Sequence, residues 1–267
     1  MCSLAKIVLT FSQIAMAKDF LILGGESTLA KYFIQTYGEK CVALNKKKCD
    51  ITNIKILEKV IKRTRAEYIL NCAAITDIGY AEKNPKECFN VNSIAVWNLD
   101  ILTRKYNKKL IHLSSDYAVN PTNVYGYSKL ISERLINKSK NLIIRTSFYS
   151  NKYYIINSLV SGKVTNAYKN AFFNPVSINR LVGEIYKNRN KHGILNIFTE
   201  KKISKYSFAT MAAKTFNIDR KLIQPVDLIN VEEKANLPLN SFVPSDIKIQ
   251  LDEDLLTFKK HLKPITS

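Results

Sequence analysis

The sequence predicts an α/β protein built on a doubly wound parallel sheet of the Rossmann type. Short apolar runs that fit buried strands alternate with segments of helical spacing from residue 20 to residue 145. Gly24-Gly25 follows the first run, and the hydroxyl-rich segment Ser114-Ser115 follows the fourth. Because parallel strands end at one common edge, both features indicate a ligand site at the carboxyl ends of the strands.

The expected elements follow one another along the chain. Runs of four or five mainly apolar residues predict strands at 20–23, 41–44, 68–72, 110–113 and 142–145. Apolar residues at helical spacing predict helices at 27–37, 54–63, 85–105 and 124–137. The alternation weakens after residue 150, where the sequence predicts a helix at 178–187, a strand at 194–198, and helices at 206–216 and near 255–262.

The change in pattern after residue 150 predicts two structural parts. We expect residues 16–150 to form a dinucleotide-binding domain, which a strand from about 175–198 rejoins. Residues 151–174 and 199–267, rich in loops and carrying Pro225, Pro238 and Pro244, would form a small discontinuous lobe for the substrate. Residues 1–15 read as an N-terminal extension, since Met16 stands directly before the first strand pattern.

Composition narrows the class of protein. The chain has 267 residues, a formal net charge of +19 and no apolar run of membrane-spanning length. Its basic residues are spread along the chain, which argues against nucleic-acid binding and suits an anionic nucleotide substrate. The five cysteines show no metal-ligand spacing, so we expect no metal site and a reducing, cytoplasmic compartment.

Tyr125 and Lys129 are the strongest candidates for catalysis. They lie four positions apart at the start of an expected helix, so their side chains would share one face. A lysine ammonium beside a phenol favours the phenolate, and we expect it to lower the pKa of Tyr125. Ser115, at the end of the preceding strand, could donate a hydroxyl to the same substrate oxygen. This set suits proton transfer to a carbinol oxygen while a nicotinamide moves hydride.

The turn after the first strand resembles a dinucleotide-binding loop with two glycines replaced. Gly24 is kept, whereas Ser27 and Ala30 stand where the second and third glycines would be, and Thr28 and Leu29 open the helix. We expect the Ser27 side chain to point toward the phosphates. A plain strand-to-helix turn is an open alternative.

The end of the second strand bears on the choice of cofactor. Asn45 is followed by three lysines, Lys46, Lys47 and Lys48. An NAD-specific site would place a carboxylate here for the ribose 2′-hydroxyl, whereas an amide followed by lysines suits a 2′-phosphate. The sequence therefore favours NADP(H) over NAD(H), although lysines that are merely solvated would look the same.

Together these segments resemble the extended short-chain dehydrogenase/reductases, most closely the dTDP-4-dehydrorhamnose reductase group. The resemblance runs from about residue 18 to the C-terminus. It rests on short segments in family order, namely residues 24–30, 49–52, 71–76, 91–92, 114–117, 125–129, 145–148, 174–176 and 203–209. The chain departs from the group in a shorter loop between Ser115 and Tyr125, and in Leu237-Pro238, where the group has Arg-Pro.

The resemblance implies a role for each matching residue. Tyr125 would give the proton to the C4 oxygen of the sugar, Lys129 would tune it and hold the nicotinamide ribose, and Ser115 would assist. Asp116 and Phe148 would contact the substrate. The residues that would line the cofactor are Gly24, Ser27, Thr28, Leu29, Asn45, Asp50, Ile51, Ala74, Ile75, Thr76, Tyr125 and Lys129.

Three functions stay open at this stage. The favoured one is NAD(P)H-dependent reduction of a nucleotide-linked 4-keto-6-deoxy sugar. The second is a non-catalytic regulatory protein, because the β regulatory subunit of methionine adenosyltransferase resembles the same group. The third is a bifunctional 3,5-epimerase/4-reductase, for which no cysteine lies near Asp116 in the sequence. The resemblance also allows a homodimer, since helices of this fold often pair between copies.

Two further residues carry an expectation about packing. His112 lies inside the expected fourth strand and Trp97 lies on the long helix at 85–105. Both are expected to be buried core residues.

Overall fold

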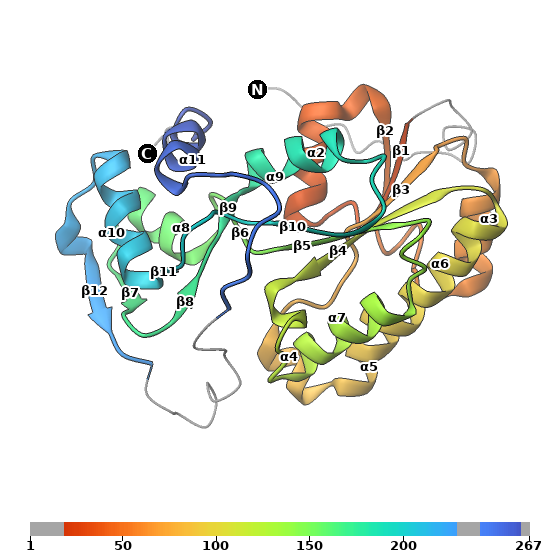
Figure 1. Cartoon of the computed structure of the whole chain (residues 1–267), viewed down its shortest axis with the longest axis horizontal. Coiled ribbons are helices and arrows are strands. Elements are labelled where there is room, and N and C mark those ends of the chain that lie inside the picture. The colour runs from red at the N-terminus through yellow and green to blue at the C-terminus, as the bar shows by residue number, and fades with distance from the viewer. Residues whose placement is uncertain (1–18, 229–240, 263–267) are drawn as a thin grey trace.

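The structure is a computed structural model that describes residues 19–228 and 241–262. The expected N-terminal extension at 1–15 and the Leu237-Pro238 pair lie outside the described residues. Figure 1 shows a wide sheet with helices above and below it, and a smaller group of helices and short strands at one end.

A six-stranded, entirely parallel sheet forms the centre of the larger part. Its strands, in spatial order, are β2 Cys41–Leu44, β1 Phe20–Leu23, β3 Tyr68–Asn71, β4 Lys109–Ser115, β5 Leu142–Thr146 and β10 Gly193–Ile197. From β1 the chain continues to β2, which lies on one side of β1, and then crosses to β3, which lies on the other side of β1. This reversal places a topological switch point between β1 and β3, where ligands of such sheets bind. The predicted fold class is confirmed.

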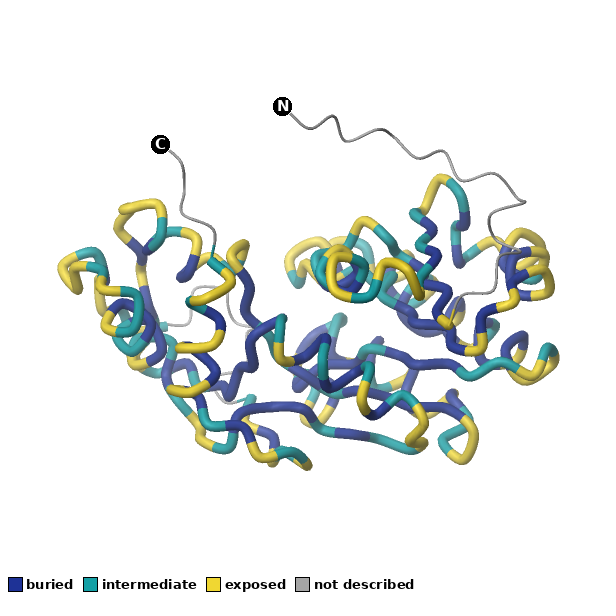
Figure 2. Tube along the Cα trace, turned by 90° about the horizontal axis from the view of Figure 1, so that it is seen from above, coloured by how far each residue is buried: buried dark blue, intermediate teal, exposed yellow. Residues whose placement is uncertain are grey.

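Helices cover both faces of this sheet. The helices are α2 Thr28–Tyr37, α3 Ile54–Arg63, α4 Ile78–Lys83, α5 Pro85–Phe89, α6 Ala95–Lys105, α7 Val124–Leu135 and α9 Ile178–Lys187. α2 and α9 pack with one core cluster, and α3 and α6 pack with the other, on the opposite face. All four residues of β1 and of β3 are buried, as strands covered on both faces require. Figure 2 shows the buried chain running through the middle of the molecule.

The long helix expected at 85–105 is interrupted. A π-helical turn, η2 Asn90–Ile94, separates α5 from α6. In α6 the face that carries Ala95, Val96 and Leu99 is buried, and Trp97, on the opposite face, is 45% exposed. The expectation that Trp97 lies in the core was wrong. His112 is fully buried, as expected, and its ring nitrogens contact Asn71 and Ser132.

The smaller part is built from short pieces of chain. It contains α8 Tyr154–Val160, α10 Lys205–Phe216 and α11 Leu251–Lys259. Three strand pairs join it together: β6 Phe148–Tyr149 with β9 Val176–Ser177, β7 Thr165–Tyr168 with β12 Ile223–Val226, and β8 Phe172–Phe173 with β11 Ile203–Ser204. Short 3-10 turns complete the described structure at η1 Gly38–Lys40, η3 Asp116–Ala118 and η4 Arg220–Leu222.

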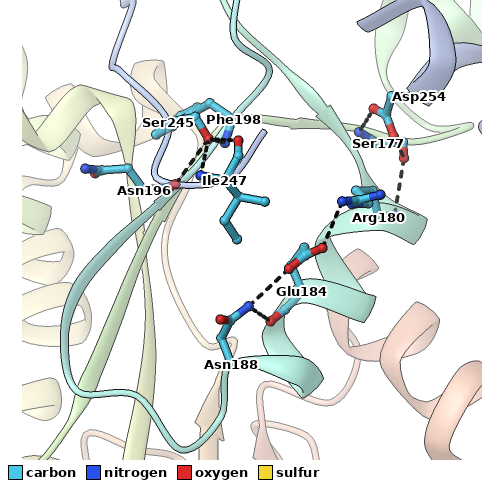
Figure 3. A network of polar contacts seen from close by, with 9 residues as sticks. All are labelled: Ser177, Arg180, Glu184, Asn188, Asn196, Phe198, Ser245, Ile247 and Asp254. Atoms are coloured by element: carbon cyan, nitrogen blue, oxygen red, sulfur yellow. Dashed lines mark hydrogen bonds and ion pairs between the residues drawn. The ribbon is translucent and has the colours of Figure 1, made fainter. Parts of the chain in front are cut away.

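A buried carboxylate ties α11 to the strand pair β6–β9. Asp254 accepts hydrogen bonds from the Ser177 amide and hydroxyl, both at 2.6 Å, and from the Tyr149 hydroxyl at 2.9 Å. Figure 3 shows Asp254 reaching Ser177, while Ser245 holds the preceding segment beside Phe198. Phe148, which belongs to the same strand pair, is thereby fixed at the mouth of the site.

Candidate active site

The turn after β1 is shaped by the close approach of two backbones. Gly24 has a φ of +76°, and a Cβ atom there would lie 2.5 Å from the backbone nitrogen of Ala73. Only glycine fits both the left-handed conformation and this contact. The turn therefore brings the start of α2 beside the end of β3, at the switch point of the sheet.

Ser27 has a local role that the sequence did not reveal. Its hydroxyl caps α2 by accepting a hydrogen bond from the Ala30 amide at 3.2 Å, which satisfies one of the free amides of the first turn. Ser27 also lines the two hollows at the carboxyl ends of the strands, so the expectation that its side chain points toward the phosphates stays a prediction. The amides of Thr28 and Leu29 lie in the first turn of α2, where no carbonyl oxygen of the helix can accept from them. They lie at the edge of the site.

Two adjoining hollows lie along the carboxyl ends of the strands. The first has a cavity volume of about 300 Å³, and the second about 350 Å³. Both are lined by Ser27, Cys72, Ala73 and Ala74, so they meet at the switch point. We call the first the adenosine-side hollow and the second the catalytic hollow.

The structure brings all the predicted site residues to these two hollows. The adenosine-side hollow is lined by Gly24, Ser27, Asn45, Asp50, Ile51, Ala74 and Ile75. The catalytic hollow is lined by Ser27, Thr28, Leu29, Ala74, Thr76, Ser115, Asp116, Tyr125, Lys129 and Phe148. This common placement is a fact of the structure, whereas the role of each residue stays a proposal.

The adenosine-side hollow carries one exposed lysine. Lys46 lines it, while Lys47 and Lys48 do not. The Asn45 amide donates to Glu26 at 2.8 Å, so part of its hydrogen-bonding capacity is already used. Burial acts to raise the pKa of Asp50, but two hydrogen bonds from Thr52 and the charge of Lys46 together lower it.

The helix that carries Tyr125 and Lys129 begins against the loop after β4. Asn123 caps it by accepting from the Gly126 amide at 2.7 Å. A Cβ atom on Gly126 would lie 2.7 Å from the carbonyl oxygen of Tyr117, so glycine allows the two segments to touch. The contact holds the first turn of α7, and with it Tyr125, beside Ser115.

Lys129 is held inside the protein. Its ammonium donates to the carbonyl oxygen of Leu113 at 2.8 Å, and the residue is 3% exposed. Burial lowers the pKa of Lys129 to about 8, although Cys88, Glu133 and Cys72 oppose this effect. The amine is therefore close to its titration range at neutral pH.

The pKa of Tyr125 moves in the direction opposite to the one expected. Burial raises it, a hydrogen bond with Ser115 lowers it, and the electrostatic effects of Asp116 and Cys88 raise it further. Desolvation of the phenolate outweighs any help from a neighbouring cation. Tyr125 therefore keeps its proton at neutral pH, as a proton donor must.

Asn92 is a positioning residue that sequence reasoning missed. It lies on the π-helical turn and bonds to both backbone groups of Ile75, each at 2.9 Å. Its amide also donates to the Ser128 hydroxyl at 2.9 Å, which in turn donates to the Tyr125 carbonyl at 2.7 Å. Asn92 thus links the cofactor-side loop to the catalytic helix. The Val91-Asn92 pair was a signal for the family, but nothing in it showed this role.

A cysteine also comes close to Tyr125 in space. Cys88 is fully buried and contacts Asn92 and Ser128. It does not line either hollow, and burial raises the pKa of its thiol. Over the described residues, no group of three or more His, Cys, Asp or Glu side chains could hold a metal ion. Within residues 19–228 and 241–262, no helix is long and apolar enough to cross a membrane.

The family of the chain follows from comparison with known proteins. The model of the RmlD substrate binding domain family matches residues 18–266, nearly the whole chain. The chain belongs to this family. The predicted resemblance is thereby confirmed.

Several members and structural neighbours of the family are similar over most of the chain. The dTDP-4-dehydrorhamnose reductase of Aggregatibacter actinomycetemcomitans is 24% identical over 84% of this chain and 86% of its own length. The crystal structure of the dTDP-4-dehydrorhamnose reductase of Bacillus anthracis in complex with NADP has a TM-score of 0.79, at 24% identity over 91% of this chain and 99% of that one. The UDP-glucose 4-epimerase of Thermotoga maritima has a TM-score of 0.73, at 15% identity over 91% and 97%. At these identities the likeness to solved structures shows the fold.

Proposed function

We propose that the protein is an NADPH-dependent reductase of a nucleotide-linked 4-keto-6-deoxy sugar of the dTDP-4-dehydrorhamnose kind, acting in deoxysugar biosynthesis. The observation that carries the proposal is that Tyr125, Lys129 and Ser115 line one hollow that opens into the dinucleotide turn. Family membership and the names of its reductase relatives support the substrate class.

The residues present fit a dinucleotide. Gly24 lets two backbones meet at the switch point, and the first-turn amides of α2 lie where a pyrophosphate binds in such sheets. Lys46 at the adenosine-side hollow favours NADP(H) over NAD(H) through the 2′-phosphate, and the NADP complex of a relative agrees. When bound, NADPH supplies hydride.

The chain's own residues would handle the proton. Tyr125, protonated because burial raises its pKa, would donate its hydroxyl proton to the C4 oxygen of the sugar. Ser115 would donate to the same oxygen once the substrate replaces Asp116 as the acceptor, since Asp116 Oδ1 accepts from the Ser115 hydroxyl at 2.7 Å in this structure. Lys129 would stabilise the phenolate that is left and bind the nicotinamide ribose. Asp116 and Phe148 would contact the sugar.

The test is oxidation of NADPH with dTDP-4-dehydrorhamnose as substrate. We expect Tyr125→Phe to lower kcat by about 10²–10⁴-fold, the usual contribution of general acid catalysis, and to leave the Kd for NADPH within about twofold. Tyr127→Phe, on the same helix but 49% exposed, is the matched control and should keep full activity. Equal activity of Tyr125→Phe and wild type would refute the mechanism.

The same assay separates the two alternatives. A wild-type protein that binds NADPH but oxidises it with no 4-keto sugar would favour the regulatory protein. For the epimerase, reaction in deuterated water is decisive, since a reductase alone leaves C3 and C5 of the sugar unlabelled. The buried position of Cys88, outside both hollows, speaks against it as the epimerase base.

We propose that the two parts of the chain bind different molecules. Residues 16–150 with about 175–198 would bind the cofactor, and 151–174 with 199–267 would bind the sugar nucleotide. Within the described residues Cys41, Cys49, Cys72 and Cys88 form no disulfide, which supports a reducing compartment such as the cytoplasm.

We also propose a homodimer that forms through an apolar surface on the end of η2, on α6 and on α7. Exposed apolar side chains recur at helical spacing there: Ile94, Trp97 and Ile101, then Tyr127, Ile131 and Leu135. Isologous pairing of two such surfaces would bury them. In sedimentation, Ile101→Lys with Ile131→Lys should give monomers, whereas Leu256→Lys, on the exposed face of α11, should not.

A further inference from the structure

His112 connects β3 to the catalytic helix α7 from inside the core. It lies on β4 and is buried, as are its neighbours Asn71 on β3 and Ser132 on α7. Its Nδ1 lies 3.2 Å from the Asn71 side-chain nitrogen, and its Nε2 lies 3.2 Å from the Ser132 hydroxyl oxygen. His112 lines neither hollow, so it does not touch a substrate or cofactor bound there. Any role in the site must pass through the side chains that it binds.

The direction of each hydrogen bond is fixed by the groups at the two ends. The side-chain oxygen of Asn71 accepts from the Ala73 amide at 3.2 Å, so its nitrogen must donate to Nδ1 of His112. The Ser132 hydroxyl donates to the Lys129 carbonyl oxygen at 2.7 Å, so it accepts from Nε2 of His112. His112 is therefore neutral, with its proton on Nε2. Burial and the charge of Lys129 also hold the pKa of His112 well below its usual value.

This chain of hydrogen bonds runs from the dinucleotide turn to the catalytic helix. At one end, Ala73 is the residue whose backbone meets Gly24. At the other end, Lys129 is bound a second time, because its ammonium donates to the carbonyl oxygen of Leu113, which follows His112 on β4. A buried polar network whose members all have partners fixes one arrangement of the elements around it. An apolar side chain would fill the same space without fixing where α7 lies on β4.

We propose that His112 is a positioning residue for Lys129: through Ser132 it sets where α7 lies on β4, and so where the Lys129 ammonium meets the nicotinamide ribose. The inference rests on the proposed function, because it concerns the same cofactor site and the role of Lys129 in it. Proton transfer stays with Tyr125, and His112 acts without changing its own protonation.

The test compares two ligands by calorimetric titration of the full chain. NADPH carries the nicotinamide ribose, whereas adenosine 2′,5′-bisphosphate carries only the adenosine half. Ser132→Ala removes the link between His112 and Lys129 with a small change in volume. We expect it to weaken NADPH binding by about threefold to tenfold, as loss of one hydrogen bond does, and to leave the bisphosphate within about twofold. Lys129→Met sets the largest loss that this mechanism allows.

Thr103→Val is the matched control for Ser132→Ala. Thr103 is also a buried hydroxyl residue on a helix, and it donates to the carbonyl oxygen three residues earlier, that of Asp100, at 3.0 Å. It lines neither hollow. The variant should lose stability in thermal melting, as Ser132→Ala does, and should keep its affinity for NADPH. A loss of NADPH affinity as large as that of Ser132→Ala would trace the effect to stability alone and overturn the proposal.

Two changes at His112 separate hydrogen bonding from packing. His112→Gln places an amide nitrogen where Nε2 donates, and should keep the affinity for NADPH within about twofold. His112→Leu fills a similar volume without a donor, and should lose as much as Ser132→Ala. The double variant His112→Leu with Ser132→Ala should lose no more than either alone, since both break one link. Equal losses in His112→Gln and His112→Leu, or losses that multiply in the double variant, would overturn the proposal. If His112→Leu does not fold, Ser132→Ala against Thr103→Val and His112→Gln decides.

The reaction and the positioning can fail separately. If Lys129→Met weakens NADPH binding and Ser132→Ala does not, this inference is overturned and the proposed reaction stands. If Ser132→Ala weakens NADPH binding selectively while the wild type oxidises no NADPH with the keto sugar, the inference stands and the proposed reaction is refuted.

Discussion

The two hollows are built by different means. At the switch point, the adenosine-side hollow depends on backbone: Gly24 meets Ala73, and α2 presents amides of its first turn. The rest of the catalytic hollow depends on side chains, among them those of Ser115, Asp116 and Tyr125. A backbone site tolerates many sequences as long as the chain path is kept, whereas a side-chain site changes with each substitution. The first can serve one cofactor throughout a family while the second sets the substrate.

The largest effect should come from disturbing the backbone contact. Gly24→Ala combines a left-handed φ with a Cβ 2.5 Å from the Ala73 nitrogen, so we expect it to abolish NADPH binding and to destabilise the fold by roughly 2–4 kcal/mol. Gly193→Ala is the control, since Gly193 has a φ of +88° but nothing within 4 Å of its Cβ position. It should cost about 1 kcal/mol, from backbone strain alone. Thermal melting and NADPH titration would measure both.

Normal NADPH binding by Gly24→Ala would contradict the idea that the adenosine-side hollow depends on the backbone contact with Ala73. The idea also fails if the two alanine variants lose the same stability, because the close approach to Ala73 would then contribute nothing.

The sequence predicted the strands of the central sheet far better than the short elements of the smaller part. Strands such as Phe20–Leu23 are buried on both faces, so a continuous apolar run is a direct signal. The strands β6, β8, β9 and β11 have two residues each, too few to show any periodicity. Several elements there were therefore missed, as were α4 and α8.

Side-chain environment was the second limit. The cap that Ser27 makes to the Ala30 amide was not predicted, because one sequence does not distinguish a capping serine from a loop serine. Trp97 was misplaced because the sequence alone did not show which face of the helix packs against the sheet. The raised pKa of Tyr125 likewise depends on burial, which composition does not show.

The smallest effect should come from the exposed lysine of the adenosine-side hollow. Lys46 is the one of the three consecutive lysines that lines it, and it is solvent-exposed. Exposed ion pairs contribute about 0.2–1 kcal/mol, so Lys46→Ala should weaken NADPH by roughly twofold to fivefold and leave NADH unchanged. The difference should shrink as salt is added, because screening acts on exposed charges. Lys47→Ala, the matched control, should change neither affinity. Equal losses for NADPH and NADH would mean that Lys46 does not contact the 2′-phosphate, and the preference for NADPH would then have to come from the backbone of the turn.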